Sequence, residues 1–225
     1  MITLAIDAST YVGTVAVLRG STLIGKGEAM MRGETEERLM PAVVSTLGEA
    51  GCTVRDVARV ICGAGPGSFT SLRIAGAIAK GIVMGSGERG DGLYAVSSLA
   101  LIVASRSDSL EPGKWLALMD AMRGERYAAL FEVGARGRVR EIERLGMIRD
   151  ADVARECARL DARAIGPREM VEASPHARGV APLFDDIIAH GRVPLDSWEP
   201  DYGRLAEAQV KWEAAHGRSL QSGAP

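Results

Sequence analysis

The stretch GAGPGSFTSLRIAGAIAKG, residues 63–81, decides the fold because it has the outline of a phosphate-binding loop. A glycine-rich bend, a small hydroxyl residue and a following helix are the usual parts of an anion site. The run VARVICG before it, residues 57–63, is short and apolar, as a buried strand is. The stretch is therefore a strand-to-helix connection of the kind found in α/β proteins.

The details of the loop favour a turn over a phosphate site. A Walker A loop needs a lysine before its hydroxyl residue, whereas Gly67 is followed by the letters SFT. Gly63, Gly65 and Gly67 also have the wrong spacing for a dinucleotide-binding fingerprint. We interpret the loop as a tight turn that starts a helix with Ser68 or Thr70 as its N-cap. A phosphate cradle is the alternative.

The chain before this loop has the pattern of an antiparallel meander followed by a helix. Short apolar runs near residues 2–7, 13–19 and 22–30 are separated by turn residues, which predicts three strands. Apolar residues at helical spacing predict a helix over 35–50 and a second one over 70–85.

The second half of the chain begins like the first. LAIDASTYVGTVAVL aligns with LALMDAMRGERYAALF, with Asp7 on Asp120, and each is an apolar strand ending in Asp, a turn and another strand. This indicates a duplicated α/β unit, and a chance likeness of two hairpins is the alternative. We expect an N-terminal subdomain over 1–99 and a C-terminal subdomain over 100–225. The last helix is expected to pack back on the N-terminal lobe, before a flexible tail over 218–225.

The composition is that of an ordinary globular protein. The 225 residues are 47% hydrophobic and 25% charged, and the formal net charge of −2 gives no overall attraction to nucleic acid. Cys52, Cys62 and Cys157 lie far apart, without a metal-binding spacing, and are expected to be reduced. The sequence has neither a signal peptide nor an apolar run of about twenty residues, so we expect a cytoplasmic protein.

Few residues could carry chemistry. His176, His190 and His216 lack the spacing of metal ligands and are expected at the surface. Asp7 and Asp120 each end a strand, where a carboxylate that holds Mg²⁺ would sit in an actin-like ATPase. We prefer to interpret both as caps of the turns that follow them. A nucleophile elbow is not found in the sequence.

Two further features concern surfaces. The arginine-rich run over 136–149 is interrupted by glutamates, which predicts a solvated surface of paired charges. The helices over 35–50 and 70–85 present apolar or small residues, and Gly76 and Gly81 leave parts of the second helix bare. Such faces suit a close helix contact with a partner, and burial in the core of the chain itself is the alternative.

Six segments resemble the bacterial TsaB family and occur in the same order: LAIDAST, ERLMPAVVSTL, GAGPGSFTSLRIAGAIAKG, AVSSL, LMDAMRGERYAALF and EPDYGR. The likeness is close over residues 2–131 and patchy afterwards. Its most specific element is GPGSFT-x-LR, although Ser71 stands where the family usually has glycine. TsaB is a small, degenerate paralogue of TsaD in the actin/sugar-kinase/Hsp70-like superfamily. The resemblance therefore implies an α/β fold of two duplicated subdomains with mixed sheets.

The resemblance implies a subunit rather than an enzyme. TsaB proteins resemble non-catalytic partners of TsaD, the catalytic subunit of the complex that makes threonylcarbamoyladenosine beside the anticodon of tRNA. The ATPase TsaE joins them in bacteria. For this chain the resemblance implies a scaffold without catalytic residues, cofactor or metal. Such a scaffold meets tRNA through the complex, does not contact membranes and forms a homodimer when alone. A free-standing actin-fold ATPase or small-molecule kinase that uses Asp7 and Asp120 is the alternative.

The resemblance also implies that the two helices bind the catalytic partner. The expected interface consists of Arg38, Leu39, Ala42, Val43, Ser68, Leu72, Arg73, Ala75, Gly76 and Ala79. A charge introduced there, as in Leu39→Glu or Ala75→Arg, is then expected to abolish partner binding and leave the monomer folded.

Overall fold

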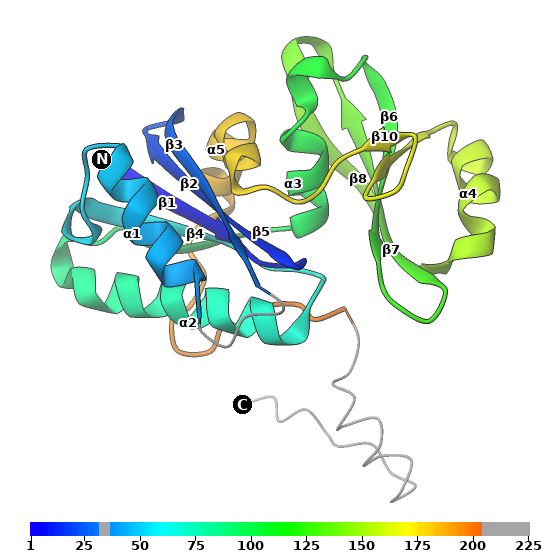
Figure 1. Ribbon diagram of the computed structural model, residues 1–225. Helices are drawn as coiled ribbons and strands as arrows, with labels where there is room; N and C mark the ends of the chain where they lie inside the picture. The colour runs from blue at the N-terminus through cyan, green and yellow to red at the C-terminus, as the bar shows by residue number, and fades with distance from the viewer. Residues whose placement is uncertain (32–36, 204–225) are drawn as a thin grey trace, which may run out of the picture.

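The computed structural model describes residues 1–31 and 37–203, which form two lobes, each around a five-stranded mixed sheet (Figure 1). Lobe A contains β1 (Ile2–Asp7), β2 (Val12–Arg19), β3 (Thr22–Met30), β4 (Val57–Gly63) and β5 (Gly92–Val96), in the order β3-β2-β1-β4-β5. Lobe B contains β6 (Gly113–Asp120), β7 (Glu125–Val133), β8 (Val139–Arg149), β9 (Arg163–Gly166) and β10 (Val171–Glu172), in the order β10-β9-β6-β7-β8.

The α-helices cover the faces of these sheets. They are α1 (Leu39–Glu49), α2 (Phe69–Ser86), α3 (Ser98–Ala104), α4 (Val153–Leu160) and α5 (Val180–His190). Within the described ranges, no helix is both long enough and apolar enough to cross a membrane.

The two sheets repeat one topology. In lobe A, β1, β2 and β3 form an antiparallel meander, α1 follows, and β4 and β5 then add parallel strands beside β1. Lobe B repeats this order with β6, β7 and β8, then α4, then β9 and β10. The duplication predicted from the sequence is therefore confirmed. The second copy differs in one element, because a turn at residues 167–170 takes the place of α2.

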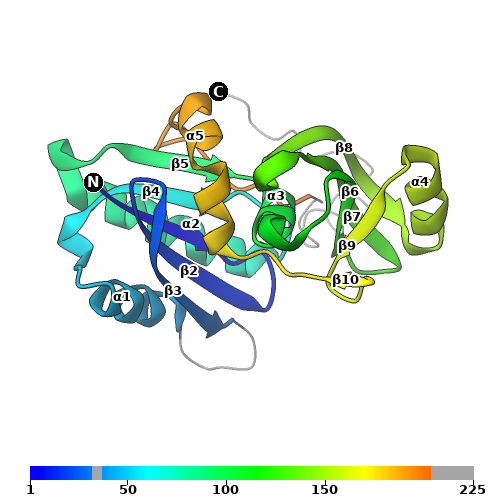
Figure 2. The same ribbon diagram turned by 90° about the horizontal axis from the view of Figure 1, so that it is seen from above.

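The last helix of each half packs against the sheet of the other half. α3 follows β5 in the chain but contacts β6 and β7, and α5 follows β10 but contacts β5. One buried cluster contains Ile102 of α3, Phe184 of α5, Ala5 of β1 and Ala117 of β6. The lobes thus share a core at their junction, where Figure 2 shows α3. The boundary expected between residues 99 and 100 falls inside α3.

The first predicted helix begins later than expected. α1 starts at Leu39, because the carboxylate of Glu37 accepts the N–H groups of Leu39 and Met40 and so takes the place of a preceding turn. Residues 35 and 36 of the predicted helix lie outside the described residues. α2 matches the predicted range 70–85 to within one residue at each end. The predicted last helix and the tail over 218–225 also lie outside the described residues.

Lobe A contains a partly buried ion pair between Arg59 and Asp91, and Asp91 also binds the segment after α5. Arg59 Nε donates to Asp91 Oδ2 at 2.6 Å, and its guanidinium lies 5.2 Å and 5.3 Å from the ring centroids of Tyr94 and Phe184. Arg192, just after α5, also pairs with Asp91 at 2.8 Å. Burial raises the pKa of Asp91, but the hydrogen bond and charge of Arg59 outweigh this, so the pKa is lowered overall.

Asp91→Ala should lower the free energy of unfolding by about 2–4 kcal/mol, because it leaves Arg59 without a counter-charge in a partly buried site. Glu132→Ala removes the partner of exposed Arg140 and is the control, with an expected loss below about 1 kcal/mol. The folded-state pKa of Asp91 is lowered, so its ionised carboxylate adds to the free energy of unfolding. This stabilisation is complete above the unfolded pKa of 3.8 and is lost as the pH falls through the folded pKa. Urea unfolding from neutral pH downward measures both effects, and equal losses for the two variants would contradict this assignment.

Candidate functional site

The carboxylate of Asp7 lies fully buried at the end of β1, beside the start of α3. Its Oδ1 accepts from the N–H of Ser9 at 3.1 Å and from the Ser9 hydroxyl at 2.7 Å. Its Oδ2 accepts from the Ser98 hydroxyl at 2.5 Å. Burial raises the pKa of Asp7, and these donors offset only part of the rise. The carboxylate caps the turn after β1, as the sequence interpretation preferred.

The glycine-rich loop after β4 closes onto the same turn. The N–H of Ser68 donates to the carbonyl of Ser9 at 2.8 Å. A Cβ on Gly63 would overlap the buried carboxylate, and one on Gly67 would overlap the backbone of Ser9. The loop is the tight strand-to-helix turn predicted from the sequence, and its glycines allow the close approach. Ser68 is the N-cap residue of α2, but its hydroxyl lies 3.0 Å from the hydroxyl of Ser71 and does not bond a helix N–H.

Asp120 lies on the face of the lobe B sheet that is turned away from the junction between the lobes. On β6, Ala117 and Met119 belong to the core between the lobes, whereas Leu116 and Leu118 face α4. Because side chains alternate along a strand, Asp120 lies on the α4 side. There its Oδ2 pairs with Arg168 at 3.0 Å, and its Oδ1 accepts the N–H of the turn residue 122 at 2.8 Å.

The register identifies the counterpart of Asp7 in lobe B as Met119. The inner-face pair Ala5–Ala16 in lobe A corresponds to the pair Ala117–Ala129 in lobe B. Asp7 lies two residues after Ala5 on β1, and Met119 lies two residues after Ala117 on β6. The sequence alignment, which placed Asp7 on Asp120, was therefore wrong by one residue. The two weak candidates for a nucleotide or metal site do not face a common space.

His176 corrects the expectation that all histidines lie at the surface. It is buried, its Nδ1 accepts the N–H of Arg178 at 3.0 Å, and burial and the charge of Arg178 lower its pKa to about 4. His190 is exposed, as expected, and His216 lies outside the described residues. Among the residues that the structure describes, no group of three or more His, Cys, Asp or Glu side chains could hold a metal ion. All three cysteines are free thiols.

Most of the residues expected at the partner interface are buried within this chain. The buried ones are Leu39, Val43, Leu72, Ala75, Gly76 and Ala79, and those at least partly accessible are Arg38, Ala42, Ser68 and Arg73. The core of lobe A uses the regular apolar stripe of each helix. Leu39 and Ala75 are fully buried, so Leu39→Glu or Ala75→Arg would bury a charge, and we now expect both variants to destabilise the monomer.

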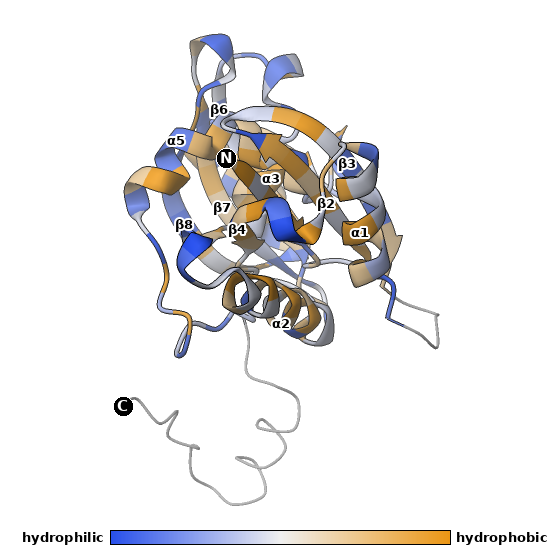
Figure 3. Cartoon of the chain, turned by 90° about the vertical axis from the view of Figure 1, so that its left-hand side faces the viewer, coloured by the Kyte–Doolittle hydropathy of each residue, from blue (hydrophilic) through white to orange (hydrophobic). Residues whose placement is uncertain are grey.

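A second apolar row on the same helices is exposed, and we call it the α1/α2 face. Val44 of α1 is 52% exposed and Met84 of α2 is 71% exposed. Beside α2 lies a hollow of about 350 Å³, which is lined by Ile78 and Gly81 of α2, by Met40 of α1 and by Arg55 and Arg89, among others. Figure 3 shows hydrophobic residues along both helices, and they include the buried residues of the core stripe. The sequence signal that could have found this row was a set of apolar residues beside the core stripe, four positions apart.

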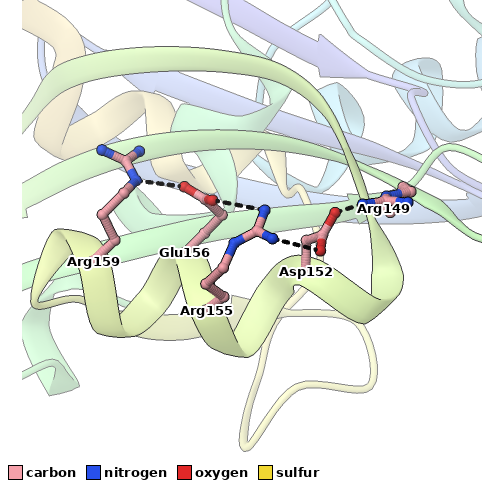
Figure 4. Close-up of polar contacts among 5 residues, drawn as sticks. All are labelled: Arg149, Asp152, Arg155, Glu156 and Arg159. Carbon is pink, nitrogen blue, oxygen red and sulfur yellow. Dashed lines mark hydrogen bonds and ion pairs between the residues drawn. The ribbon is translucent and has the colours of Figure 1, made fainter.

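The arginine-rich run is a surface of paired charges, as predicted. Arg140 pairs with Glu132 at 2.8 Å, and Arg144 pairs with Glu141 at 3.3 Å. Figure 4 shows the continuation, in which charges of alternating sign run from the end of β8 into α4: Arg149, Asp152, Arg155, Glu156 and Arg159. Exposed pairs of this kind contribute at most about 1 kcal/mol each.

The repeated meander with two added parallel strands, and the final helices exchanged at the junction, define a protein of the actin/sugar-kinase/Hsp70-like fold class. A family model described as TsaD, tRNA N6-adenosine threonylcarbamoyltransferase, matches residues 32–154, which is more than half of the chain. The chain belongs to this family, and within it is a TsaB/YeaZ-type protein, as the resemblance predicted.

Individual relatives support this placement. The Bacillus subtilis protein TsaB, named for tRNA threonylcarbamoyladenosine biosynthesis, is 27% identical over 232 residues, which cover 94% of this chain and 98% of the relative. Escherichia coli TsaB is 31% identical over 137 residues, covering 57% of this chain and 54% of the relative. A crystal structure from Pseudomonas aeruginosa, of an uncharacterized protein with similarity to peptidase YeaZ, is 26% identical with a TM-score of 0.75. The match covers 90% of this chain and 99% of that one.

Asp7→Asn should leave the protein folded and change how its stability depends on pH. Because the folded-state pKa of Asp7 is raised above its ordinary value of 3.8, the wild-type protein loses stability as the pH rises from that value to the folded pKa. The amide does not titrate, so the variant should lack this loss. Urea unfolding from about pH 4 to about pH 8 measures the difference, and superimposable pH profiles would contradict the assignment.

Proposed function

We propose that this chain is a non-catalytic scaffold subunit of the complex that transfers threonylcarbamoyl to the adenosine beside the anticodon of tRNA. It binds a TsaD-like catalytic subunit as a heterodimer and activates it. The observation that carries the proposal is the exposed apolar α1/α2 face, which includes Val44, Met84 and the hollow beside α2, on a member of the TsaD family.

The α1/α2 face has the properties of a protein interface. It includes the exposed aliphatic side chain of Val44 and the exposed side chain of Met84, and the hollow beside α2 offers a place for a side chain of the partner. Arg38 and Arg73 lie exposed at the starts of the two helices and would stand at the rim. Apolar centres with a charged rim are typical of such contacts.

The inter-lobe groups support a subunit over an independent ATPase or kinase. The carboxylate of Asp7 is occupied by donors from Ser9 and Ser98, and its counterpart in lobe B is Met119. A Mg²⁺-nucleotide site needs carboxylates that are open to the metal and face it.

Other partners follow from the same assembly. A TsaE-like ATPase joins the heterodimer, tRNA is met through the complex, and the work takes place in the cytoplasm. Without its partner the chain uses the α1/α2 face for a symmetric homodimer, because an exposed apolar patch can be self-complementary.

Reconstitution tests the role. The purified chain should make no threonylcarbamoyladenosine alone, and it should restore synthesis when added to the catalytic subunit, the ATPase, the enzyme that forms the threonylcarbamoyl adenylate, and tRNA. Mass spectrometry of digested tRNA measures the product. Product formed by this chain without the catalytic subunit would overturn the scaffold role, and magnesium-dependent ATP turnover by the chain alone would favour the ATPase or kinase.

Val44→Glu should weaken binding to the catalytic subunit by about a hundredfold or more, because it places a charge on the apolar face. Ile142→Glu is the matched control, since Ile142 is 40% exposed on β8 of lobe B. Both variants should unfold at the wild-type urea concentration. Sedimentation velocity with the partner measures binding, and normal assembly of Val44→Glu, or an equal defect in the control, would place the interface elsewhere.

A further inference from the structure

Residues 193–203, which we call the strap, leave α5 and run along lobe A toward the junction with lobe B (Figure 1). The N–H of Val193 donates to the carbonyl of Leu93 at 2.9 Å, which places the start of the strap beside the edge strand β5. Leu195 and Trp198 then pack against the outer core of lobe A. The strap therefore passes round the β5 edge, from the sheet face that carries α5 to the face that carries α2.

The strap packs against α2 at Gly76. A Cβ on Gly76 would lie 3.6 Å from Trp198 and 3.7 Å from Pro200, so a side chain longer than alanine would displace the strap. Gly81, on the same helix, is a contrast, because no described atom lies within 4 Å of its Cβ position. The bare surface predicted at Gly76 is thus filled by the chain itself.

The end of the strap joins the two lobes through main-chain groups. The N–H of Asp201 donates to the carbonyl of Ala64 in the glycine-rich loop at 2.7 Å. The carbonyl of Tyr202, the next residue, accepts from the hydroxyl of Tyr127 on β7 of lobe B at 3.2 Å. Gly203, with φ of 70°, packs against the ring of Tyr127 and against the loop. Three consecutive residues therefore contact both lobes.

Side chains add to this junction. The ring of Tyr202 lies 4.5 Å from the ring of Phe69 at the start of α2. The carboxylate of Asp201 lies 3.9 Å from the guanidinium of Arg144 on β8 of lobe B. The exposed ion pair is weak, so the main-chain bonds and the glycine contacts carry most of the attachment.

We propose that the strap is a clamp that fixes the orientation of the two lobes. The shared core holds the lobes together at α3 and α5, on one face of sheet A, and the strap holds them together beside α2, on the other face (Figure 1). Two-lobed proteins change shape by hinge or shear motion about such a junction. An attachment on each side opposes that motion. The clamp concerns the free chain and does not depend on the proposed function.

Gly76→Leu should release the strap in the full-length protein, because the new side chain takes the space of Trp198 and Pro200. Amide hydrogen exchange should rise about tenfold or more in three places: the strap, the glycine-rich loop of lobe A, and the adjoining ends of β7 and β8 in lobe B. Trp198→Ala removes the same contact from the side of the strap and should give the same pattern.

Gly81→Leu is the matched control, with the same change on the same helix away from the strap, and its exchange should match the wild type in all three places. A rise confined to the strap and lobe A would overturn the clamp and make the strap an appendage of lobe A. An equal rise in Gly81→Leu would show that the effect belongs to α2, and it too would overturn the proposal. Neither result bears on partner binding, which Val44→Glu tests separately.

Discussion

The structure depends on how the buried carboxylate of Asp7 is satisfied. A charged or protonated carboxyl group away from water needs hydrogen bonds, and the hydroxyl of Ser98 supplies one at 2.5 Å. The same hydroxyl accepts the N–H of Gly65 at 3.1 Å, and Ser98 is the first residue of α3, which packs on lobe B. One side chain thus positions β1, the glycine-rich loop and the helix that carries the shared core. The bare Cα of Gly63 leaves room for the carboxylate.

α2 shows how one helix serves several contacts. Leu72 and Ala79 face the core of lobe A, and Gly76 faces the strap. A glycine inside a helix costs about 1 kcal/mol relative to alanine, and at Gly76 the close packing of the strap offsets that cost. Gly81 and Gly85 have no described atom within 4 Å of their Cβ positions. Packing within the described residues therefore does not offset the free-energy cost of these two glycines. Both line the hollow of the α1/α2 face.

The sequence predicted those parts of the fold that depend on local pattern. The meander, the range of α2, the repeat of the two halves and the turn role of Asp7 follow from apolar spacing and turn residues. The position of Asp120 was missed because a shift of one residue moves a side chain to the other face of a strand, and residue spacing alone does not fix that register. The burial of most expected interface residues was missed because an apolar stripe has the same pattern whether it faces a sheet or a partner.

The glycine-rich loop shows why such a motif is weak support for a nucleotide. Its glycines touch a carboxylate, a turn and the strap, which are all parts of this chain, so packing alone requires them. The same letters would be needed whether or not a phosphate ever bound there. The residue across the junction from Asp7 bears on this question more directly than the loop does. In lobe B that residue is Met119, whose thioether side chain joins the shared core instead of binding a hard cation. Met119 thereby helps to hold the two lobes together at their junction.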